Sequence, residues 1–311
     1  MYIINLLKEY DREDKKTIKY FREGYFTKNL KFLLQHELEE ELYRVKDEAV
    51  EDVIYEFEID KEILPRLSIK TPDQTLEILS KHPKSFCRLG DGEIEIIKGH
   101  DCPFQKYHPE LARKMVSILS KQKDNLYVGL NGAYFDSPFK FMERNHKFYR
   151  TRGSSYRRFF LNVCDLNSTY LDACCFGVYF RFGDDYDFEG HYNTIRNLFK
   201  DKKITIVCGK GIFDKLTYDI FDLATEKNFI YAPAKNAFDE YDSIIERINM
   251  EVPKDHLVCI ILGMTATVLA ADLADMGYTA WDLGHIAKDY DCYLKKTEKT
   301  DQNMSKFWAP D

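Results

Sequence analysis

The sequence has no long uninterrupted run of apolar residues. The apolar stretch at residues 1–7 ends at Lys8, and no segment reaches the roughly 18 apolar residues that span a membrane. The eight cysteines form no CxxC pair, and no histidines stand at zinc-finger spacing. These absences predict no transmembrane anchor, no disulfide framework and no structural zinc site. We therefore expect a cytoplasmic protein.

An excess of positive charge is also missing. The 45 Lys and Arg residues are outnumbered by 52 Asp and Glu, which gives a formal net charge of −7. Binding along a phosphate backbone needs a basic surface, so nucleic acid is excluded as a partner. With 311 residues, 44% of them hydrophobic, the chain is long enough to bury a substantial core.

The first 70 residues differ from the rest. They are dense in charge, their apolar residues recur at helical spacing, and residues 37–60 are strongly acidic, which is typical of a solvated helical face. Pro65 and Thr71-Pro72-Asp73 then mark a boundary, with Thr71 as N-cap of a helix over 72–80. We predict a mainly helical extension over 1–70 and one main domain over 71–311.

A repeated order of apolar run, small residues and amphipathic stretch predicts alternating strands and helices after residue 200. The expected strands are 204–208, 229–232, 257–262 and 279–283, and the expected helices are 212–224, 237–249 and 265–276. Two further strands are expected at 85–89 and 126–130. Parallel strands need crossover helices, so the fold class is α/β, with a Rossmann-like, mostly parallel sheet covered on both faces. Ligands of such sheets bind beyond the carboxyl ends of the strands.

The most informative motif ends the first of these strands: Arg88, Gly90, Asp91, Gly92 and Glu93. In extended backbone, side chains two apart point the same way, so Asp91 and Glu93 could converge on one divalent cation. The glycines allow a sharp turn, and Arg88 could neutralise a phosphate or hold a carboxylate by paired hydrogen bonds. Asp-Gly is equally typical of a tight hairpin turn. The apolar residues that follow favour a strand-to-helix junction, which suits a cation that neutralises a departing diphosphate.

A second motif closes the strand 257–262 and opens the following helix. Backbone N–H groups at a helix start favour phosphate, and the hydroxyls of Thr265 and Thr267, after Gly263, could add donors. Capping of the helix by Thr265 explains the same residues without a ligand. A third motif, Asp282 with His285, follows the last strand, where His285 could bind the metal, contact phosphate or transfer a proton.

Other candidates follow strands or stand alone. Gly209, Lys235 and Asn236 lie after expected strands and are candidate donor-binding residues, and Arg181 is a candidate acceptor-binding residue. The Gly-Lys-Gly run at 209–211 lacks the third glycine of a dinucleotide fingerprint and is not a Walker loop. This excludes dehydrogenase and NTPase assignments.

Taken together, these motifs resemble the GT-D glycosyltransferases, formerly catalogued as domain of unknown function 1792. The resemblance covers about residues 75–295, and it rests on Arg-Leu-Gly-Asp-Gly-Glu at 88–93, Pro-Ala-Lys-Asn-Ala-Phe at 233–238, the 262–270 segment and Asp-Leu-Gly-His at 282–285. It implies a Rossmann-like fold, a UDP-sugar donor, in particular UDP-glucose, and Mn²⁺ or Mg²⁺ held through Asp91 and Glu93. Met264 and Cys208 depart from the family pattern.

The resulting hypothesis is metal-dependent transfer of a hexose from a UDP-sugar to a glycan, glycoprotein or lipid-linked acceptor, in polysaccharide or glycoprotein biosynthesis. A lipid-linked acceptor would place the protein at the inner membrane face, and a homo-oligomer is compatible with the sequence. Two alternatives stay open. One is a non-catalytic nucleotide-sugar-binding or scaffold subunit of a polysaccharide assembly complex, favoured by the two departures, and the other is a metal enzyme that cleaves phosphate esters.

Overall fold

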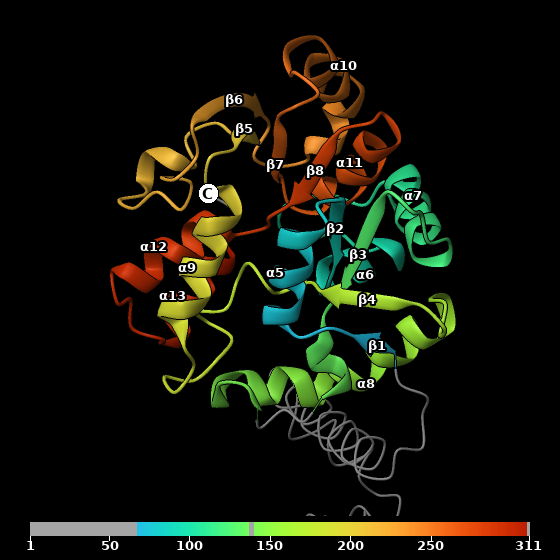
Figure 1. Cartoon of the computed structure of the whole chain (residues 1–311). Coiled ribbons are helices and arrows are strands. Elements are labelled where there is room, and N and C mark those ends of the chain that lie inside the picture. Colours follow the sequence, from blue (N-terminus) through green and yellow to red (C-terminus); the bar gives the residue numbers. More distant parts are fainter. Residues whose placement is uncertain (1–66, 137–139, 310–311) are drawn as a thin grey trace, which may run out of the picture.

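The computed structural model describes residues 67–136 and 140–309 (Figure 1). The helical extension expected over residues 1–70 therefore lies almost entirely outside the described residues. Within them, no helix is both long enough and apolar enough to cross a bilayer.

An eight-stranded sheet forms the centre of the fold, and every pair of neighbouring strands in it is parallel. The strand order is β1-β4-β3-β2-β8-β7-β5-β6. The strands are β1 Ser68–Ile69, β2 Ser85–Leu89, β3 Leu126–Leu130, β4 Thr169–Asp172, β5 Lys203–Gly209, β6 Glu226–Ala232, β7 Leu257–Ile261 and β8 Thr279–Asp282. The predicted fold class is confirmed.

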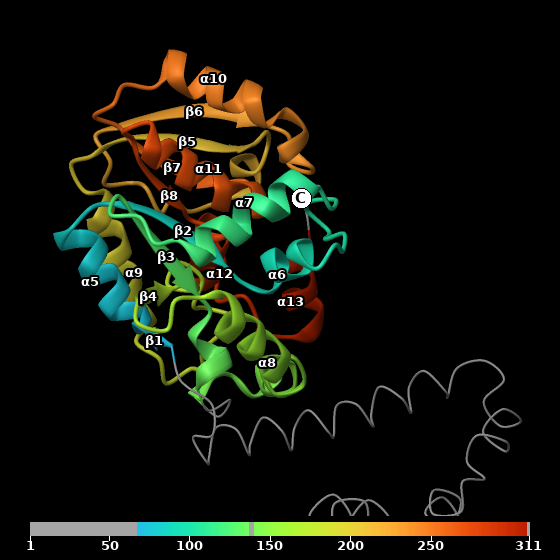
Figure 2. The ribbon, with the colours of Figure 1, turned by 90° about the vertical axis from the view of Figure 1, so that its right-hand side faces the viewer.

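Helices cover both faces of the sheet (Figures 1 and 2). One core lies beneath α6 (Asp91–Ile97), α7 (Pro109–Ser120), α8 (Glu143–Val163), α10 (Tyr241–Glu251) and α11 (Met264–Asp275). The other lies beneath α5 (Pro72–Lys81), α9 (Phe188–Phe199), α12 (Ile286–Leu294) and α13 (Asp301–Trp308). Side chains of β2 alternate between them, since Cys87 and Leu89 face the first core and Phe86 faces the second.

Local sequence signals explain several of these elements. Helix α5 starts as predicted, because the Thr71 hydroxyl accepts a hydrogen bond from the Gln74 N–H and the Gln74 side chain accepts one from the Thr71 N–H. The predicted strands at 85–89 and 126–130 are β2 and β3, and they pair in register from Ser85–Leu126 to Leu89–Leu130. The sequence signals at 257–283 likewise give β7, α11 and β8.

The predicted helix over 212–224 is wrong. Only a short 3₁₀ turn, Phe213–Lys215, forms there, followed by turns. The buried Asp291 carboxylate accepts hydrogen bonds from the N–H groups of Thr217 and Tyr218, and Asp219 accepts one from Phe221. These carboxylates take the N–H groups that a helix would use internally. The predicted helix over 237–249 starts with a 3₁₀ turn at Ala237–Glu240, before α10.

Because all strands run in the same direction, their carboxyl ends lie along one edge of the sheet. The motif at 88–93 follows β2, the Asp282 motif follows β8, and Gly263 follows β7, so these three motifs leave adjacent strands. We call this edge, from the end of β4 to the end of β6, the carboxyl edge.

Candidate functional site

The motif after β2 is a strand-to-helix junction, as predicted. Strand β2 ends at Leu89, Gly90 is the N-cap, and Asp91 is the first residue of α6. The predicted reason for the convergence of Asp91 and Glu93 is wrong, however. Both residues belong to the first turn of a helix, where side chains two apart point about 200° away from each other. Glu93 turns back, and its Oε2 accepts a hydrogen bond from the Gly90 N–H at 2.8 Å.

Both carboxylates lie where negative charge is costly. Burial raises the pKa of Glu93 to about 7, and the nearby Asp282 carboxylate adds to the shift. The Asp91 side chain is exposed on one side, but the protein around it raises its pKa by desolvation, and Glu95 adds a smaller repulsion. The start of α6 therefore concentrates negative charge that the protein only partly compensates.

Arg88 is the cation of this region, and its guanidinium is directed inward. Nη2–H donates to Oδ1 of Asp282 at 2.9 Å, Nε–H donates to the Asp282 carbonyl oxygen at 2.9 Å, and Nη1–H donates to the Ala173 carbonyl oxygen at 2.6 Å. Burial raises the pKa of Asp282, and the guanidinium acts against that shift. Arg88 thus ties together the ends of β2, β4 and β8, and any contact with a phosphate would use its remaining N–H capacity.

His285, predicted to line the site, is the N-cap of α12. Its ring lies among three aromatic rings, with centroids 5.5 Å from Phe104, 5.4 Å from Phe307 and 5.3 Å from Trp308. Trp308 is 49% exposed. An aromatic wall formed by Phe104, His285, Phe307 and Trp308 therefore stands beyond the end of β8.

The helix that follows β7 also starts at this edge. Gly263 is its N-cap with φ 51°, and an added Cβ there would lie 3.2 Å from Cβ of Phe104. A Cβ on Gly92 would lie 2.7 Å from Cε of Met264, the first residue of α11, so Gly92 allows the starts of α6 and α11 to meet. In the described part of the chain, no acceptor is found for the N–H groups of Met264 and Thr265.

The threonine hydroxyls of α11 do not face this edge. Thr265 and Thr267 are fully buried, and their hydroxyls donate to Oε1 of Gln105 at 3.2 Å and to the Arg88 carbonyl oxygen at 2.9 Å. Capping by Thr265 is wrong too, because the helix begins one residue earlier and has no side-chain cap. These hydroxyls are therefore not available to a phosphate, and Gly263 is the exposed residue of the helix start.

The remaining candidates lie along the same edge toward β6. Gly209 ends β5, and its lack of a side chain lets the backbone of Ala234 approach, since an added Cβ would lie 2.9 Å from Cα of Ala234. Lys235 is exposed after β6. Asn236 adopts a left-handed conformation, and its side chain accepts a hydrogen bond from the Lys106 N–H at 2.8 Å, so it positions the segment before α7.

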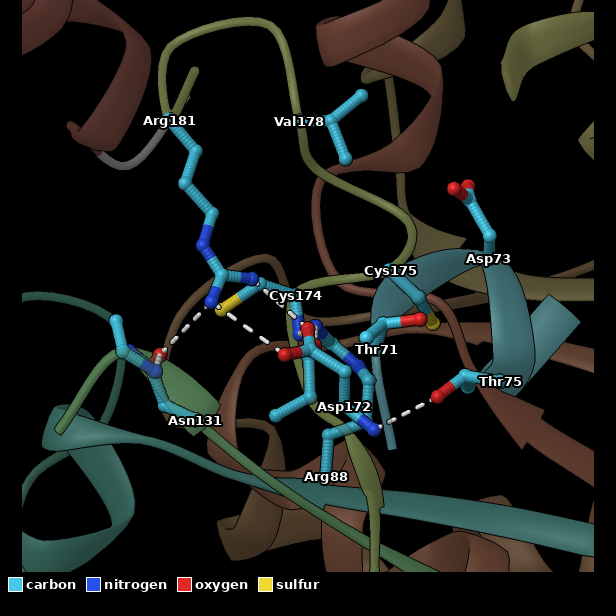
Figure 3. Close-up of polar contacts among 12 residues, drawn as sticks. Thr71, Asp73, Thr75, Arg88, Asn131, Asp172, Cys174, Cys175, Val178 and Arg181 are labelled. Carbon is cyan, nitrogen blue, oxygen red and sulfur yellow. Dashed lines mark hydrogen bonds and ion pairs between the residues drawn. The ribbon is translucent and has the colours of Figure 1, made fainter. Parts of the chain in front are cut away.

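Arg181, predicted to bind an acceptor, is buried (Figure 3). Its Nη1–H donates to Oδ1 of Asp172 at 2.8 Å and its Nη2–H donates to Oδ1 of Asn131 at 3.3 Å. Asp172 ends β4 and Asn131 follows β3, so Arg181 links two strand ends. The Thr75 hydroxyl of α5 accepts a hydrogen bond from the Asp172 N–H, which attaches α5 to the same point. Arg181 therefore holds together the ends of β3 and β4 at the carboxyl edge.

A divalent cation would find only part of its coordination sphere here. Among residues 67–136 and 140–309, no group of three His, Cys, Asp or Glu side chains is arranged to hold a metal. Mg²⁺ and similar ions commonly bind one or two carboxylates and complete their shell with substrate phosphates and water. Asp91 offers an exposed carboxylate to such an ion, and Glu93 lies in the same helical turn, with its Oε2 bonded to the Gly90 N–H.

Several residues of the edge were not predicted. Asn131 directly follows an expected strand, so the strand-end rule would have found it. Asp172 would have needed recognition of β4, whose four residues give too short a pattern. Gln105 is buried and accepts hydrogen bonds from the Phe238 N–H and Thr265, yet it lies in a segment without periodicity. Trp308 reaches His285 only through tertiary packing.

Comparison with known proteins identifies a family to which the sequence is similar. A family profile described as the glycosyltransferase GT-D fold matches residues 86–309. The chain is 29% identical over 243 residues to glycosyltransferase GlyD of Streptococcus pneumoniae serotype 4, which covers 77% of this chain and 29% of GlyD. The chain thus spans less than a third of that relative.

Solved structures agree with this match. A structure of the highly conserved domain of unknown function 1792, described as a distinct glycosyltransferase fold, gives a TM-score of 0.70 at 30% identity and covers 74% of this chain and 82% of that one. A new glycosyltransferase (DUF1792) from Streptococcus sanguinis gives a TM-score of 0.69 at 26% identity, covering 74% and 86%. The profile begins in β2 and ends just after α13, so it includes the motif at 88–93, the start of α11 and the aromatic wall.

Proposed function

Because this chain belongs to the GT-D family of glycosyltransferases, we propose that it transfers a hexose, in particular glucose, from a UDP-sugar to a glycan or glycoconjugate acceptor. The main support is the pair Asp91 and Glu93 in the first turn of α6, at the carboxyl end of a central strand. Arg88 and Asp282 hold that strand end against β8. Polysaccharide or glycoprotein biosynthesis is the context we propose.

We propose that Asp91 and Glu93 hold Mn²⁺ or Mg²⁺ together with the donor diphosphate. Two carboxylates suffice if phosphate oxygens and water complete the shell. Their raised pKa values support this, because a cation would stabilise both ionised carboxylates. When bound, the ion would offset the charge that develops on the departing UDP.

The rest of the carboxyl edge supplies binding groups for the donor. The N–H groups at the start of α11 and the exposed Lys235 offer positive charge to a diphosphate. Arg88 is a positioning residue, because its hydrogen bonds fix the backbone on which Asp282 and Gly284 stand. His285 and the aromatic wall flank the same region, and we propose that they contact the nucleoside or sugar.

Calorimetric titration with a panel of nucleotide sugars, with and without Mn²⁺, tests this proposal. The test variant is Asp91→Asn/Glu93→Gln, in which the introduced glutamine keeps an oxygen for the Gly90 N–H, so that α6 should still form. Asp124→Asn is the control, because Asp124 is exposed and precedes β3 at the opposite edge.

We expect Mn²⁺-dependent binding of one UDP-sugar to the wild type and the control, and its loss in the double variant. Slow Mn²⁺-dependent release of sugar into water should accompany binding. Binding without any turnover would favour the scaffold alternative, and cleavage of simple phosphate esters would favour the phosphoesterase. If no nucleotide sugar binds the wild type, the proposed function is wrong.

A further inference from the structure

A pocket of about 910 Å³ is lined by none of the predicted site residues and by no residue of the aromatic wall. Its walls are α5 and α9, which lie side by side (Figures 1 and 2), and the loop at 183–187. A volume of this size is typical of small-molecule and cofactor sites. The described chain therefore contains a second candidate binding site, on the sheet face opposite to α6.

This pocket is joined to the carboxyl edge. Phe182, in its lining, directly follows Arg181, which is hydrogen-bonded to Asp172 at the end of β4. Asp73 also lines it, near the start of α5, and Thr75 of the same helix binds the Asp172 backbone (Figure 3). Strand β4 is two strands from β2, roughly 10 Å along the sheet. An extended ligand could lie in the pocket and reach across the edge toward Asp91.

The charge of the pocket excludes the donor as its ligand. Four carboxylates line it, from Asp73, Glu77, Asp185 and Asp187, against the lysines Lys81 and Lys140. Both lysines already pair with carboxylates, Lys81 with Glu77 at 2.5 Å and Lys140 with Asp136 at 2.8 Å. A nucleoside diphosphate would be repelled, whereas a ligand that presents hydroxyl groups would find hydrogen-bond acceptors.

The uncharged lining has the chemistry of a carbohydrate site. Phe182 and Tyr186 stack with centroids 4.3 Å apart and an interplanar angle of 9°, and both are only partly buried. Exposed Ser80, Thr194 and Asn197 supply hydroxyl and amide groups from the two helices. A rigid aromatic platform beside several polar groups suits a ring with one apolar face and a rim of hydroxyls.

We infer that this pocket binds a neutral saccharide segment of the acceptor, while the reacting end of that acceptor extends over the carboxyl edge. The identification of the ligand as an acceptor rests on the proposed function. The existence of the pocket, its acidic lining and its aromatic platform are independent of the proposed function.

Two tryptophan substitutions from opposite walls would fill the pocket: Ser80→Trp on α5 and Thr194→Trp on α9. Asn193→Trp is the matched control, because Asn193 is exposed, is next to Thr194 and is not part of the lining. The four full-length proteins are applied to an array of neutral and acidic oligosaccharides and to an arginine-rich peptide. Their thermal unfolding and their hydrolysis of UDP-glucose are measured in parallel.

We expect neutral oligosaccharides to bind the wild type and Asn193→Trp, and to bind Ser80→Trp and Thr194→Trp about tenfold or more weakly. Melting curves and UDP-glucose hydrolysis should be the same in all four. Equal glycan binding by all four, a preference for acidic glycans, binding of the arginine-rich peptide alone, or no binding by a folded wild type would each overturn the inference. Absence of hydrolysis in every protein would contradict the proposed function instead, and would leave the glycan result to be judged separately.

Discussion

Arg88 and Asp282 are 194 residues apart in the sequence, yet the Arg88 guanidinium binds both the side chain and the main chain of Asp282, each at 2.9 Å. The side chains are 19% and 3% exposed, respectively. This is a largely buried ion pair, in which removing one partner leaves the other charged and poorly solvated.

Arg88→Ala should therefore lower the free energy of unfolding by about 3–5 kcal/mol, measured by urea denaturation. Adding Asp282→Ala should restore part of that loss, because the second change removes the orphaned carboxylate. The exposed pair Lys81–Glu77 is the comparison, and Lys81→Ala should leave stability unchanged. Simple additivity of Arg88→Ala and Asp282→Ala would show that the two side chains do not stabilise each other.

Gly284 is needed at its position because Arg88 lies against it. An added Cβ would overlap Nη2 of Arg88, and the glycine has φ 54°, so Gly284→Ala must displace the guanidinium and strain the backbone. We expect a lower melting temperature and weaker binding of UDP with Mg²⁺. Gly177→Ala is the control, since nothing lies within 4 Å of its added Cβ, and it should melt at or above the wild-type temperature. Equal melting of both variants would contradict the close packing.

The two tryptophans of the chain differ in their surroundings. Trp281 is 1% exposed and Trp308 is 49% exposed, so Trp308 should report events at the aromatic wall. Titration with UDP and Mg²⁺ should quench the intrinsic fluorescence, and Trp308→Phe should abolish the change while calorimetry still detects binding. Quenching that persists in Trp308→Phe would place the nucleotide away from this wall.

Asp289 is buried, and its Oδ2 accepts hydrogen bonds from the N–H groups of Val178 and Tyr179 and from the Tyr192 hydroxyl. Burial raises its pKa to about 6. The folded state then binds the proton more tightly than the unfolded state. The contribution of Asp289 to the free energy of unfolding therefore falls by on the order of 3 kcal/mol as the pH rises from about 4 to 6.

Asp289→Asn removes that titration but keeps an oxygen for the three donors. The unfolding free energy of the wild type minus that of the variant should therefore fall as the pH rises from the ordinary aspartate pKa to the raised pKa of Asp289, and become constant above it. Chemical denaturation at a series of pH values measures this difference. A difference that is constant over this interval and rises only below the ordinary aspartate pKa would mean that the hydrogen bonds outweigh burial and that the pKa of Asp289 is lowered.

The sequence predicted correctly those strands and helices that are determined by residues within or next to them. Strands β2, β3, β7 and β8 have apolar runs bounded by small or polar residues, and α5 has its cap in the sequence. The prediction of a helix over 212–224 failed because the N–H groups of Thr217 and Tyr218 donate to Asp291, which is 74 residues from Thr217. A helical pattern cannot reveal such a competitor.

For the candidate site, the sequence predicted the positions of the motifs but not the partners of their side chains. The strand-end rule placed the 88–93 motif, Gly263 and Asp282 after the ends of strands, as the structure does. Only the structure shows that these three strands are adjacent. The partners of their side chains were not predictable, because Arg88 could bind a phosphate or a carboxylate, and only the fold presents Asp282 to it. The hydroxyls of Thr265 and Thr267 were assigned to a ligand because burial is not visible in a helix start.

The order of the strands has a consequence for synthesis on the ribosome. Strand β2 lies between β3 and β8, so one neighbour emerges soon after it, whereas the other emerges only after β3 to β7 have all been made. Until then Asp91 and Glu93 stand without Asp282 or the aromatic wall. If Asp91 and Glu93 hold the donor as proposed, nascent chains and products of early termination that lack β8 should be unable to bind it.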